Sequence, residues 1–329
     1  MSASLPAEGL QAGINYLVKE TPSSLYRTGA LRMLRDADGS DSKFEGVEFS
    51  REVVPLKDGR GFRDGQGCLL DDQGFQVLDA PMADTSLDFM SMQAVVDRYY
   101  AECCEIVKQA TGARQVSAFD HNLRSVAGKS ARERIQDGQE VQGPARVVHG
   151  DYTLTSAPQR LRDLGQAPAL NDTYTRLLGD RKTLLDPDQV ESMIASGRYA
   201  FINLWRNIDA APVRSDPLIL CDAQTVRPED LSVFEIHYSD RVGENYWAKP
   251  APGHSWFIYP EIERSEAMLI KQWDSAGPLA RSGGRVGDAA APDAPCTFSL
   301  HTAYYAPETM NGKPPRWSIE VRCVVFYDL

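Results

Sequence analysis

The sequence of 329 residues lacks any uninterrupted apolar run of about 18 residues, the length that a membrane-spanning helix needs. Its first ten residues, MSASLPAEGL, contain neither the basic stretch nor the apolar core of a secretory signal. Basic residues are not in excess, since 46 acidic residues against 35 Lys and Arg give a net charge of −11. A protein that tracks a phosphate backbone needs a basic face. We therefore expect a cytoplasmic protein that binds neither nucleic acid nor membranes.

Cysteine is scarce, and no two cysteines have the Cys-x-x-Cys spacing of a zinc or redox site. The six cysteines are spread along a chain without a secretory signal, so we expect reduced thiols rather than a disulfide framework. Cys103 and Cys104 lie in a helical pattern, which favours core packing over redox chemistry. The remaining composition, 42% hydrophobic and 25% charged, is that of an ordinary globular protein and excludes wholesale disorder.

The N-terminal third predicts one strong helix. Apolar residues recur at steps of three and four over 92–110, and Gly112 is expected to end the helix. Thr85 or Ser86 is expected to cap its first turn. The rest of residues 1–85 predicts mostly irregular structure with short strand-like pieces.

After two more helical segments, at 158–180 and 186–196, the chain becomes a series of short strand-like runs separated by Pro, Gly and Asp. The predicted strands lie at 47–56, 74–80, 114–124, 198–207, 216–226, 232–239, 254–262, 267–275, 296–306 and 316–328. The composition of 277–295 predicts a flexible loop. Short strands at this spacing are typical of an antiparallel sandwich or small barrel, so the expected fold class is mainly β with helical support.

Histidine is also scarce, and a histidine-ligated metal site must draw on five residues. These are His121, His149, His237, His254 and His301. In the segment VVHGDYT, His149 and Asp151 form a His-x-Asp pair, and side chains two apart on a strand point to the same face. A third ligand from a distant strand (His237, His254 or His301) would complete a facial triad, which suits Fe(II), O₂ and a bidentate organic acid.

The last predicted strand carries a polar face. In RWSIEVR, Arg316, Ser318, Glu320 and Arg322 alternate with apolar residues. Two arginines inside a barrel are costly unless they meet anions, and a dicarboxylate co-substrate would satisfy them. Arg316 would bind its distal carboxylate as a bidentate fork, and Ser318 would add a hydroxyl hydrogen bond. The alternative is that this face is exposed to solvent and the arginines pair with Asp or Glu.

Taken together, the His-x-Asp pair, the distal His and the Arg-x-Ser pair resemble the iron(II)- and 2-oxoglutarate-dependent oxygenases, whose fold is a double-stranded β-helix or jelly roll. More specifically, the C-terminal half resembles a branch from secondary metabolism that includes a fungal gibberellin desaturase, the cephamycin-pathway hydroxylase component and aspergillic-acid-type hydroxylases. The matching segments are AFDHNLR (118–124), VVHGDYT (147–153), FINLWRNI (201–208), DPLILCDAQTV (216–226), HSWFIYPEIERSEAMLIKQWDS (254–275) and the run from His301 to Phe326. Compared with the plant branch, a Pro- and Gly-containing loop is inserted between His301 and Arg316.

The resemblance implies roles for particular residues. His149, Asp151 and His301 would bind iron, and Arg316 and Ser318 would bind the C5 carboxylate of 2-oxoglutarate.

The resemblance and the strand pattern leave other roles open. Arg322 would either approach the C1 carboxylate of 2-oxoglutarate or support the site. Asn203 and Arg206 would lie on a strand lining the same cavity, as substrate contacts or as packing. His254, at a strand start, would sit near the site and is a candidate substrate contact. His121 is expected to be structural, hydrogen-bonded to the backbone.

The implied activity is oxidation of a C–H bond in a small natural-product or amino-acid-like substrate, by hydroxylation, desaturation or ring closure. Its cofactors would be Fe(II), 2-oxoglutarate and O₂. We expect a single oxygenase domain over 1–329, with N-terminal strands and a supporting helix in 1–113 and a jelly-roll core in 114–329. A helical insert at about 155–197 is a candidate lid, and a homodimer is expected from the branch. Two alternatives stay open: a non-catalytic jelly-roll binding protein, or a metal enzyme that does not use 2-oxoglutarate.

Overall fold

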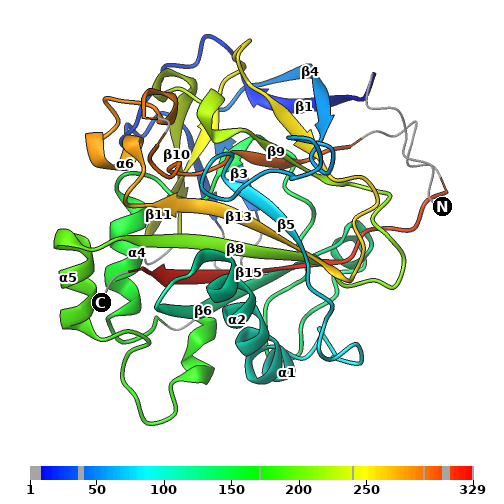
Figure 1. Cartoon of the computed structure of the whole chain (residues 1–329), viewed down its shortest axis with the longest axis vertical. Coiled ribbons are helices and arrows are strands. Elements are labelled where there is room, and N and C mark those ends of the chain that lie inside the picture. The colour runs from blue at the N-terminus through cyan, green and yellow to red at the C-terminus, as the bar shows by residue number, and fades with distance from the viewer. Residues whose placement is uncertain are drawn as a thin grey trace.

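The computed structural model describes residues 9–35, 41–169, 172–238, 241–291, 293–305 and 312–327. These residues form two β-sheets that lie one above the other, with one helix covering the smaller sheet and further helices at its end (Figure 1). The expected fold class, mainly β with helical support, is confirmed. No helix in the described part of the chain has the length and apolar character that crossing a membrane requires.

The larger sheet has ten strands. In spatial order they are β1 (Gln11–Leu17), β4 (Phe49–Asp58), β12 (Trp256–Ile258), β9 (Leu218–Cys221), β14 (His301–Ala303), β7 (His149–Gly150), β11 (Val242–Ala248), β10 (Leu231–His237), β2 (Arg32–Arg35) and β3 (Asp41–Glu45). The smaller sheet has five strands in the order β5 (Phe75–Asp79), β13 (Glu266–Asp274), β8 (Tyr199–Asn207), β15 (Ser318–Phe326) and β6 (Gln115–Arg124).

The helical elements are short. The α-helices are α1 (Met92–Ala94), α2 (Tyr100–Thr111), α3 (Val126–Ser130), α4 (Ser156–Leu164), α5 (Pro187–Ser196) and α6 (Pro278–Ser282). Single turns of other types are the π-helical η1 (Val95–Tyr99) and the 3₁₀ segments η2 (Thr173–Leu177), η3 (Ala223–Thr225), η4 (Pro228–Asp230) and η5 (Asp288–Ala290). In Figure 1, α2 lies against the five-stranded sheet beside β6, while α4 and α5 lie at one end of it.

The five-stranded sheet has a dry face and a polar face. Ile319, Val321 and Cys323 of β15 share a core with α2, so burial of their apolar surface holds the helix on the sheet. The alternate residues of β15 face the ten-stranded sheet. There Arg322 lies directly opposite Asn203 of β8 on one side and Asp120 of β6 on the other, and residues directly opposite each other share a face. The polar face predicted for the last strand is therefore an interior face.

The structure differs from the sequence-based expectation in several local elements. Three strands, β1, β2 and β3, occupy a region expected to be largely irregular, and β11 was not predicted because Gly243, Glu244 and Asn245 interrupt its apolar pattern. Ser91, not Thr85 or Ser86, caps the first helix, since its side chain accepts a hydrogen bond from the Ala94 amide. The predicted C-terminus at Gly112 is confirmed, with a left-handed φ of 66°.

Two predicted segments were also misjudged in extent. The helix expected at 158–180 ends at Gly165, just before Pro168, and only the short η2 turn follows within that range. The loop expected at 277–295 contains α6 and η5 among its described residues. The loop expected between His301 and Arg316 lies partly outside the described residues.

Candidate metal centre

Two neighbouring strands of the ten-stranded sheet bring His149 and His301 together. The two residues are directly paired between β7 and β14, and their ring centroids lie 4.3 Å apart. Asp151 follows β7, and its Oδ1 lies 3.6 Å from Nε2 of His149. The possible ligand atoms of all three residues lie within 4.8 Å of one another. A single ion can therefore touch all three side chains.

The local hydrogen bonds orient His149 for metal binding. Its Nδ1 lies 2.8 Å from the carbonyl oxygen of Val147. A carbonyl only accepts, so Nδ1 carries the proton and Nε2, on the side of Asp151, keeps its lone pair. Nδ1 of His301 is buried without a hydrogen-bond partner.

The protonation states of the three groups suit a divalent cation. Burial lowers the pKa of His149 to about 4 and also lowers the pKa of His301, so both imidazoles are neutral at pH 7. Burial alone would raise the pKa of Asp151, but the Arg322 guanidinium and the two imidazoles outweigh it and lower this pKa to about 2. Two neutral imidazoles and one carboxylate form the ligand set of non-haem Fe(II) sites with open positions.

Asp151 is held from several sides. Asn203 of β8 donates a hydrogen bond of 2.8 Å from Nδ2 to Oδ2 of Asp151, and Nε of Arg322 lies 3.8 Å from the same oxygen. The main-chain amide of Asp151 donates to Oε1 of Gln272, 3.2 Å away. Asn203 therefore contacts a candidate metal ligand, Asp151, and orients its carboxylate.

Arg322 forms ion pairs with carboxylates of the protein. Its NH1 lies 2.7 Å from Asp120, and its NH2 lies 3.5 Å from Glu320. Burial opposes its charge, but Asp120, Asp151 and Glu320 together raise the pKa of Arg322 above its usual range. Of the two roles expected for Arg322, this geometry favours support of Asp151 over contact with a co-substrate.

Arg316 is in a different electrostatic position. Its NH1 donates to the main-chain carbonyl of Asp216, its Nε has no partner, and its guanidinium carbon lies 5.6 Å from the ring centroid of Trp205. Burial lowers the pKa of Arg316 to about 10, because Asp216 and Glu320 offset the loss of hydration only in part. The hydroxyl of Ser318 is likewise buried without a partner.

Arg316 and the two histidines line one cavity between the sheets. Its lining residues are Arg124, Ala145, His149, Trp205, Leu218, His301, Ala303, Arg316 and Glu320. The charge of the buried Arg316 is only partly offset by protein carboxylates, and the hydroxyl of Ser318 on the same strand face has no partner. An anionic ligand would satisfy both groups. The residues present therefore fit a carboxylate co-substrate beside a metal ion.

Two residues expected near the site lie elsewhere. Arg206 points to the helix-covered side of β8, where NH1 donates to the carbonyls of Ala80 at 2.6 Å and Arg264 at 3.0 Å. His254 is buried in another part of the core, where Nδ1 lies 2.8 Å from the Tyr16 hydroxyl and Nε2 lies 3.3 Å from Asp230. Neither residue lines the cavity. Of the two roles left open for Arg206, the structure therefore shows packing, whereas the expected placement of His254 near the site is corrected.

The partner of His121 is also different from the one expected. Its Nδ1 lies 2.8 Å from the Tyr100 hydroxyl rather than from a backbone group, although a structural role still describes its surroundings. Sequence reasoning missed Arg124 and Gln272. Alternation along β6 from Asp120 would have placed Arg124 on the interior face, whereas no pattern in the sequence marks Gln272.

Comparison with known proteins places these observations in a family. A family model described as "Oxidoreductase/YMDC permease-like domain" matches residues 14–326. The chain is 38% identical over 202 residues to an uncharacterized protein in the dcmA 3′ region of Methylophilus leisingeri, covering 61% of this chain and 91% of the relative. It is 29% identical over 298 residues to the alpha-ketoglutarate-dependent dioxygenase phiK of a fungal species, covering 89% and 92%. It is 26% identical over 300 residues to the hydroxylase/desaturase efuI of Hormonema carpetanum, covering 86% of each.

Among solved structures, the fold matches the iron and alpha-ketoglutarate-dependent endoperoxidase NvfI with a TM-score of 0.70. The match covers 97% of this chain and 98% of that one at 20% identity, so it concerns the fold, a jelly roll. The chain belongs to the oxidoreductase family of the matching model, and its named relatives confirm the resemblance to the iron(II)- and 2-oxoglutarate-dependent oxygenases.

Proposed function

We propose that this protein is a non-haem Fe(II)- and 2-oxoglutarate-dependent dioxygenase that oxidises a C–H bond of a small natural-product or amino-acid-like substrate. The reaction would be hydroxylation, desaturation or oxidative ring closure in the biosynthesis of a secondary metabolite. One observation carries the proposal: His149 and His301, which cluster with Asp151, line the same cavity as Arg316, whose buried charge is only partly offset by its neighbours.

The residues divide the work between metal and co-substrate. His149, Asp151 and His301 would hold Fe(II), which supplies O₂ activation when bound. Arg316 would take the distal carboxylate of 2-oxoglutarate in place of its missing partner at Nε, and Ser318 would donate its free hydroxyl. Arg124 lines the same cavity and adds positive charge, which favours a dianion over a monoanion.

The walls of the cavity serve to orient the co-substrate and to exclude water. Trp205 and Leu218 give it an apolar side, and a dry site strengthens the attraction between Arg316 and a carboxylate. Behind the metal ligands, Arg322 and Asn203 keep Asp151 ionised and oriented. On the insert, Thr173 donates a hydrogen bond of 2.9 Å to Asp120, the partner of Arg322, which supports a lid role for this segment.

Formation of the Fe(II)·2-oxoglutarate chelate tests the function. Anaerobic protein with Fe(II) and 2-oxoglutarate should show the weak visible charge-transfer band of the chelate. Asp151→Ala and His301→Ala should abolish the band, and Arg316→Ala should raise the concentration of 2-oxoglutarate that it requires. A wild-type protein without the band would favour one of the alternatives, a binding protein or a metal enzyme that does not use 2-oxoglutarate. A succinate-release screen over amino acids and natural-product intermediates would then identify the substrate.

The cellular setting is part of the same proposal. All six cysteines are free thiols, which supports a reducing compartment such as the cytoplasm. We propose a homodimer that binds a small substrate and neither nucleic acid nor membranes. Light scattering across a dilution series would test the oligomeric state.

A further inference from the structure

Strand β13 contains an irregularity next to the candidate metal centre. In the pairing with β8, Ile270 lies opposite Asn203 and Lys271 opposite Ile202, but the next paired residue is Trp273, opposite Phe201. Gln272 is therefore an extra residue, a β-bulge. Bulges are enriched beside active sites, where they re-aim a side chain.

The bulge changes which residues share a face of the strand. Lys271 and Asp274 are three apart, so regular alternation would put them on opposite faces. With Gln272 as the extra residue they share one face, and Nζ of Lys271 lies 3.1 Å from Oδ2 of Asp274. Gln272 and Trp273 then both turn toward the interior.

Gln272 reaches one of the proposed metal ligands. Its Oε1 accepts the hydrogen bond of 3.2 Å from the main-chain amide of Asp151. The side chain is completely buried, and its Nε2 has no hydrogen-bond partner. An amide with one end on a ligand residue and the other end unpaired is a poor arrangement for packing alone, because buried polar groups are normally satisfied.

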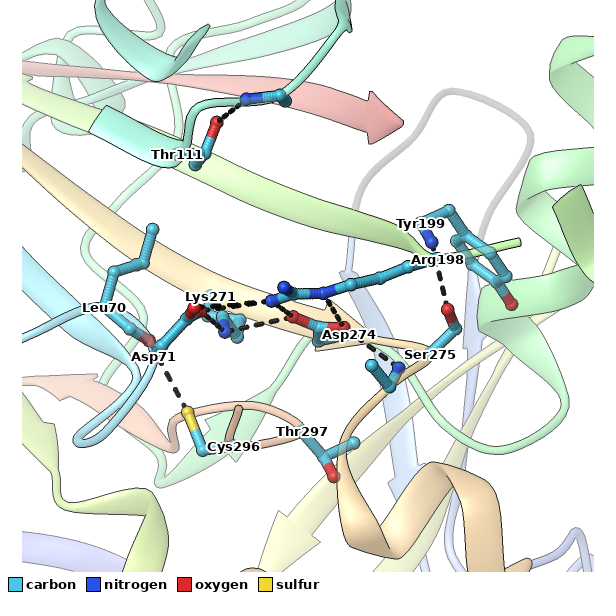
Figure 2. A network of polar contacts seen from close by, with 12 residues as sticks. Leu70, Asp71, Thr111, Arg198, Tyr199, Lys271, Asp274, Ser275, Cys296 and Thr297 are labelled. Atoms are coloured by element: carbon cyan, nitrogen blue, oxygen red, sulfur yellow. Dashed lines mark hydrogen bonds and ion pairs between the residues drawn. The ribbon is translucent and has the colours of Figure 1, made fainter. Parts of the chain in front are cut away.

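An ion cluster built around the buried Lys271 and Asp274 holds the bulge from the other side. We call Lys271, Asp71, Asp274 and Arg198 the Lys271 cluster (Figure 2). Arg198 lies 2.7 Å from Asp274 and 3.3 Å from Asp71, while Lys271 contacts both acids from a fully buried position. A fully buried ammonium group needs carboxylate partners to offset its lost hydration, so the contacts with Asp71 and Asp274 hold Lys271 in place.

The main chain of Lys271 is fixed as well. Its amide donates to the carbonyl of Gly74 at 2.7 Å, and its carbonyl accepts from the amide of Ser299 at 3.0 Å. Ser299 is two residues before His301, so the bulge is tied directly to the segment that carries another proposed ligand. The Lys271 cluster lies outside the cavity. It nevertheless anchors the main chain of β13 at the bulge, which contacts Asp151 on one side and the segment before His301 on the other.

We propose that Gln272 is a positioning residue of the metal centre, which fixes the main chain of Asp151 through its side-chain carbonyl, and that the Lys271 cluster holds the bulge that points Gln272 there. The inference rests on the proposed function, because it assigns Gln272 a role toward the same metal ion.

Metal binding by Gln272 variants tests the inference without requiring turnover. Gln272→Met keeps the length of the side chain and removes the acceptor, whereas Gln272→Glu keeps an acceptor oxygen. We expect Gln272→Met to weaken Mn(II) binding, measured by calorimetry, by about 10- to 100-fold, the usual effect of losing a group that orients a ligand. Gln272→Glu should restore much of this affinity. The Tm of the metal-free Gln272→Met protein should stay near that of the wild type.

A matched control and a second variant complete the design. Arg60→Met breaks the exposed ion pair with Glu266 at the start of the same strand and should leave Mn(II) affinity unchanged. Lys271→Met should weaken Mn(II) binding in the same direction as Gln272→Met, provided that circular dichroism shows a folded protein.

The outcomes separate the inference from the function on which it rests. If wild-type protein binds Mn(II) and forms the iron chelate while Gln272→Met binds Mn(II) equally well, the positioning role is wrong and the proposed function stands. If wild-type protein binds neither Mn(II) nor Fe(II) with 2-oxoglutarate, the proposed function and this inference fail together.

Discussion

His149 and His301 lie directly opposite each other on the paired strands β7 and β14, with ring centroids 4.3 Å apart. Nearly half of the chain separates them in sequence, so only the pairing of these two short strands creates the site. The pairing also explains why Asp151 completes the cluster, since it leaves β7 two residues after His149, on the same side.

The first prediction concerns Arg316. Because its guanidinium is buried and incompletely paired, its replacement should affect co-substrate binding more than folding. Losing one partner of a buried charge pair costs about 2–5 kcal/mol, so Arg316→Met should raise the KM for 2-oxoglutarate by roughly 30-fold or more. Steady-state succinate release measures the effect. Arg214→Met is the control, since Arg214 is half exposed and paired with Glu261; an equal KM increase in that variant would contradict the assignment.

Strand alternation made much of the site predictable. Period-two patterns placed His149 and Asp151 on one face and gathered Arg316, Ser318 and Glu320 on another, and the structure has both arrangements. Such arrangements can be predicted from sequence because burial of one face of a strand fixes its register.

The errors in placing site residues come from the same alternation of side chains along a strand, and from a strand that breaks it. Asn203 and Arg206 are expected on a strand that lines the cavity, with contact or packing left open for both. Residues three apart on the regular strand β8 face opposite sides, so the two residues cannot share one role. In β13 the reverse holds, since the bulge at Gln272 lets Lys271 and Asp274 share a face. Nothing local marks a bulge, because tertiary contacts create it. The division of the chain into segments 1–113 and 114–329 stays a prediction.

The second prediction distinguishes support from co-substrate contact at Arg322. Removing this guanidinium leaves Asp120, Asp151 and Glu320 with like charges close together. Arg322→Met should therefore lower the free energy of unfolding of the metal-free protein by about 3–5 kcal/mol, as measured by urea denaturation. The KM for 2-oxoglutarate of the residual folded enzyme should change far less than in Arg316→Met. A stable Arg322→Met protein with a large KM defect would instead support contact with the C1 carboxylate.

The third prediction concerns Arg206, which links β8 to the segments around Ala80 and Arg264. Arg206→Met removes two hydrogen bonds that the buried guanidinium donates to main-chain carbonyls, at a cost of about 2–3 kcal/mol in unfolding free energy. The KM values for 2-oxoglutarate and substrate should stay near those of the wild type, because the side chain does not reach the cavity. Chemical denaturation and steady-state kinetics on the same preparation give both quantities. A raised substrate KM without loss of stability would restore the substrate-contact role.

The last prediction is that the free energy of unfolding depends on pH through His121. Burial lowers the pKa of His121 to about 4, against about 6.5 in the unfolded chain, with Arg322 adding to the shift and Asp120 opposing it. Between these values the unfolded state binds more protons than the folded state, so stability is complete above pH 6.5 and falls as the pH drops toward 4. His121 alone should remove about 1.5 kcal/mol of unfolding free energy between pH 6.5 and pH 5. Urea denaturation across this range should give His121→Gln a shallower dependence of unfolding free energy on pH than the wild type.

Tyr100→Phe, which removes the hydroxyl partner but keeps the buried imidazole, should retain the wild-type dependence, because burial is the main cause of the pKa shift. Equal slopes for His121→Gln and the wild type would show that another group controls the acid sensitivity.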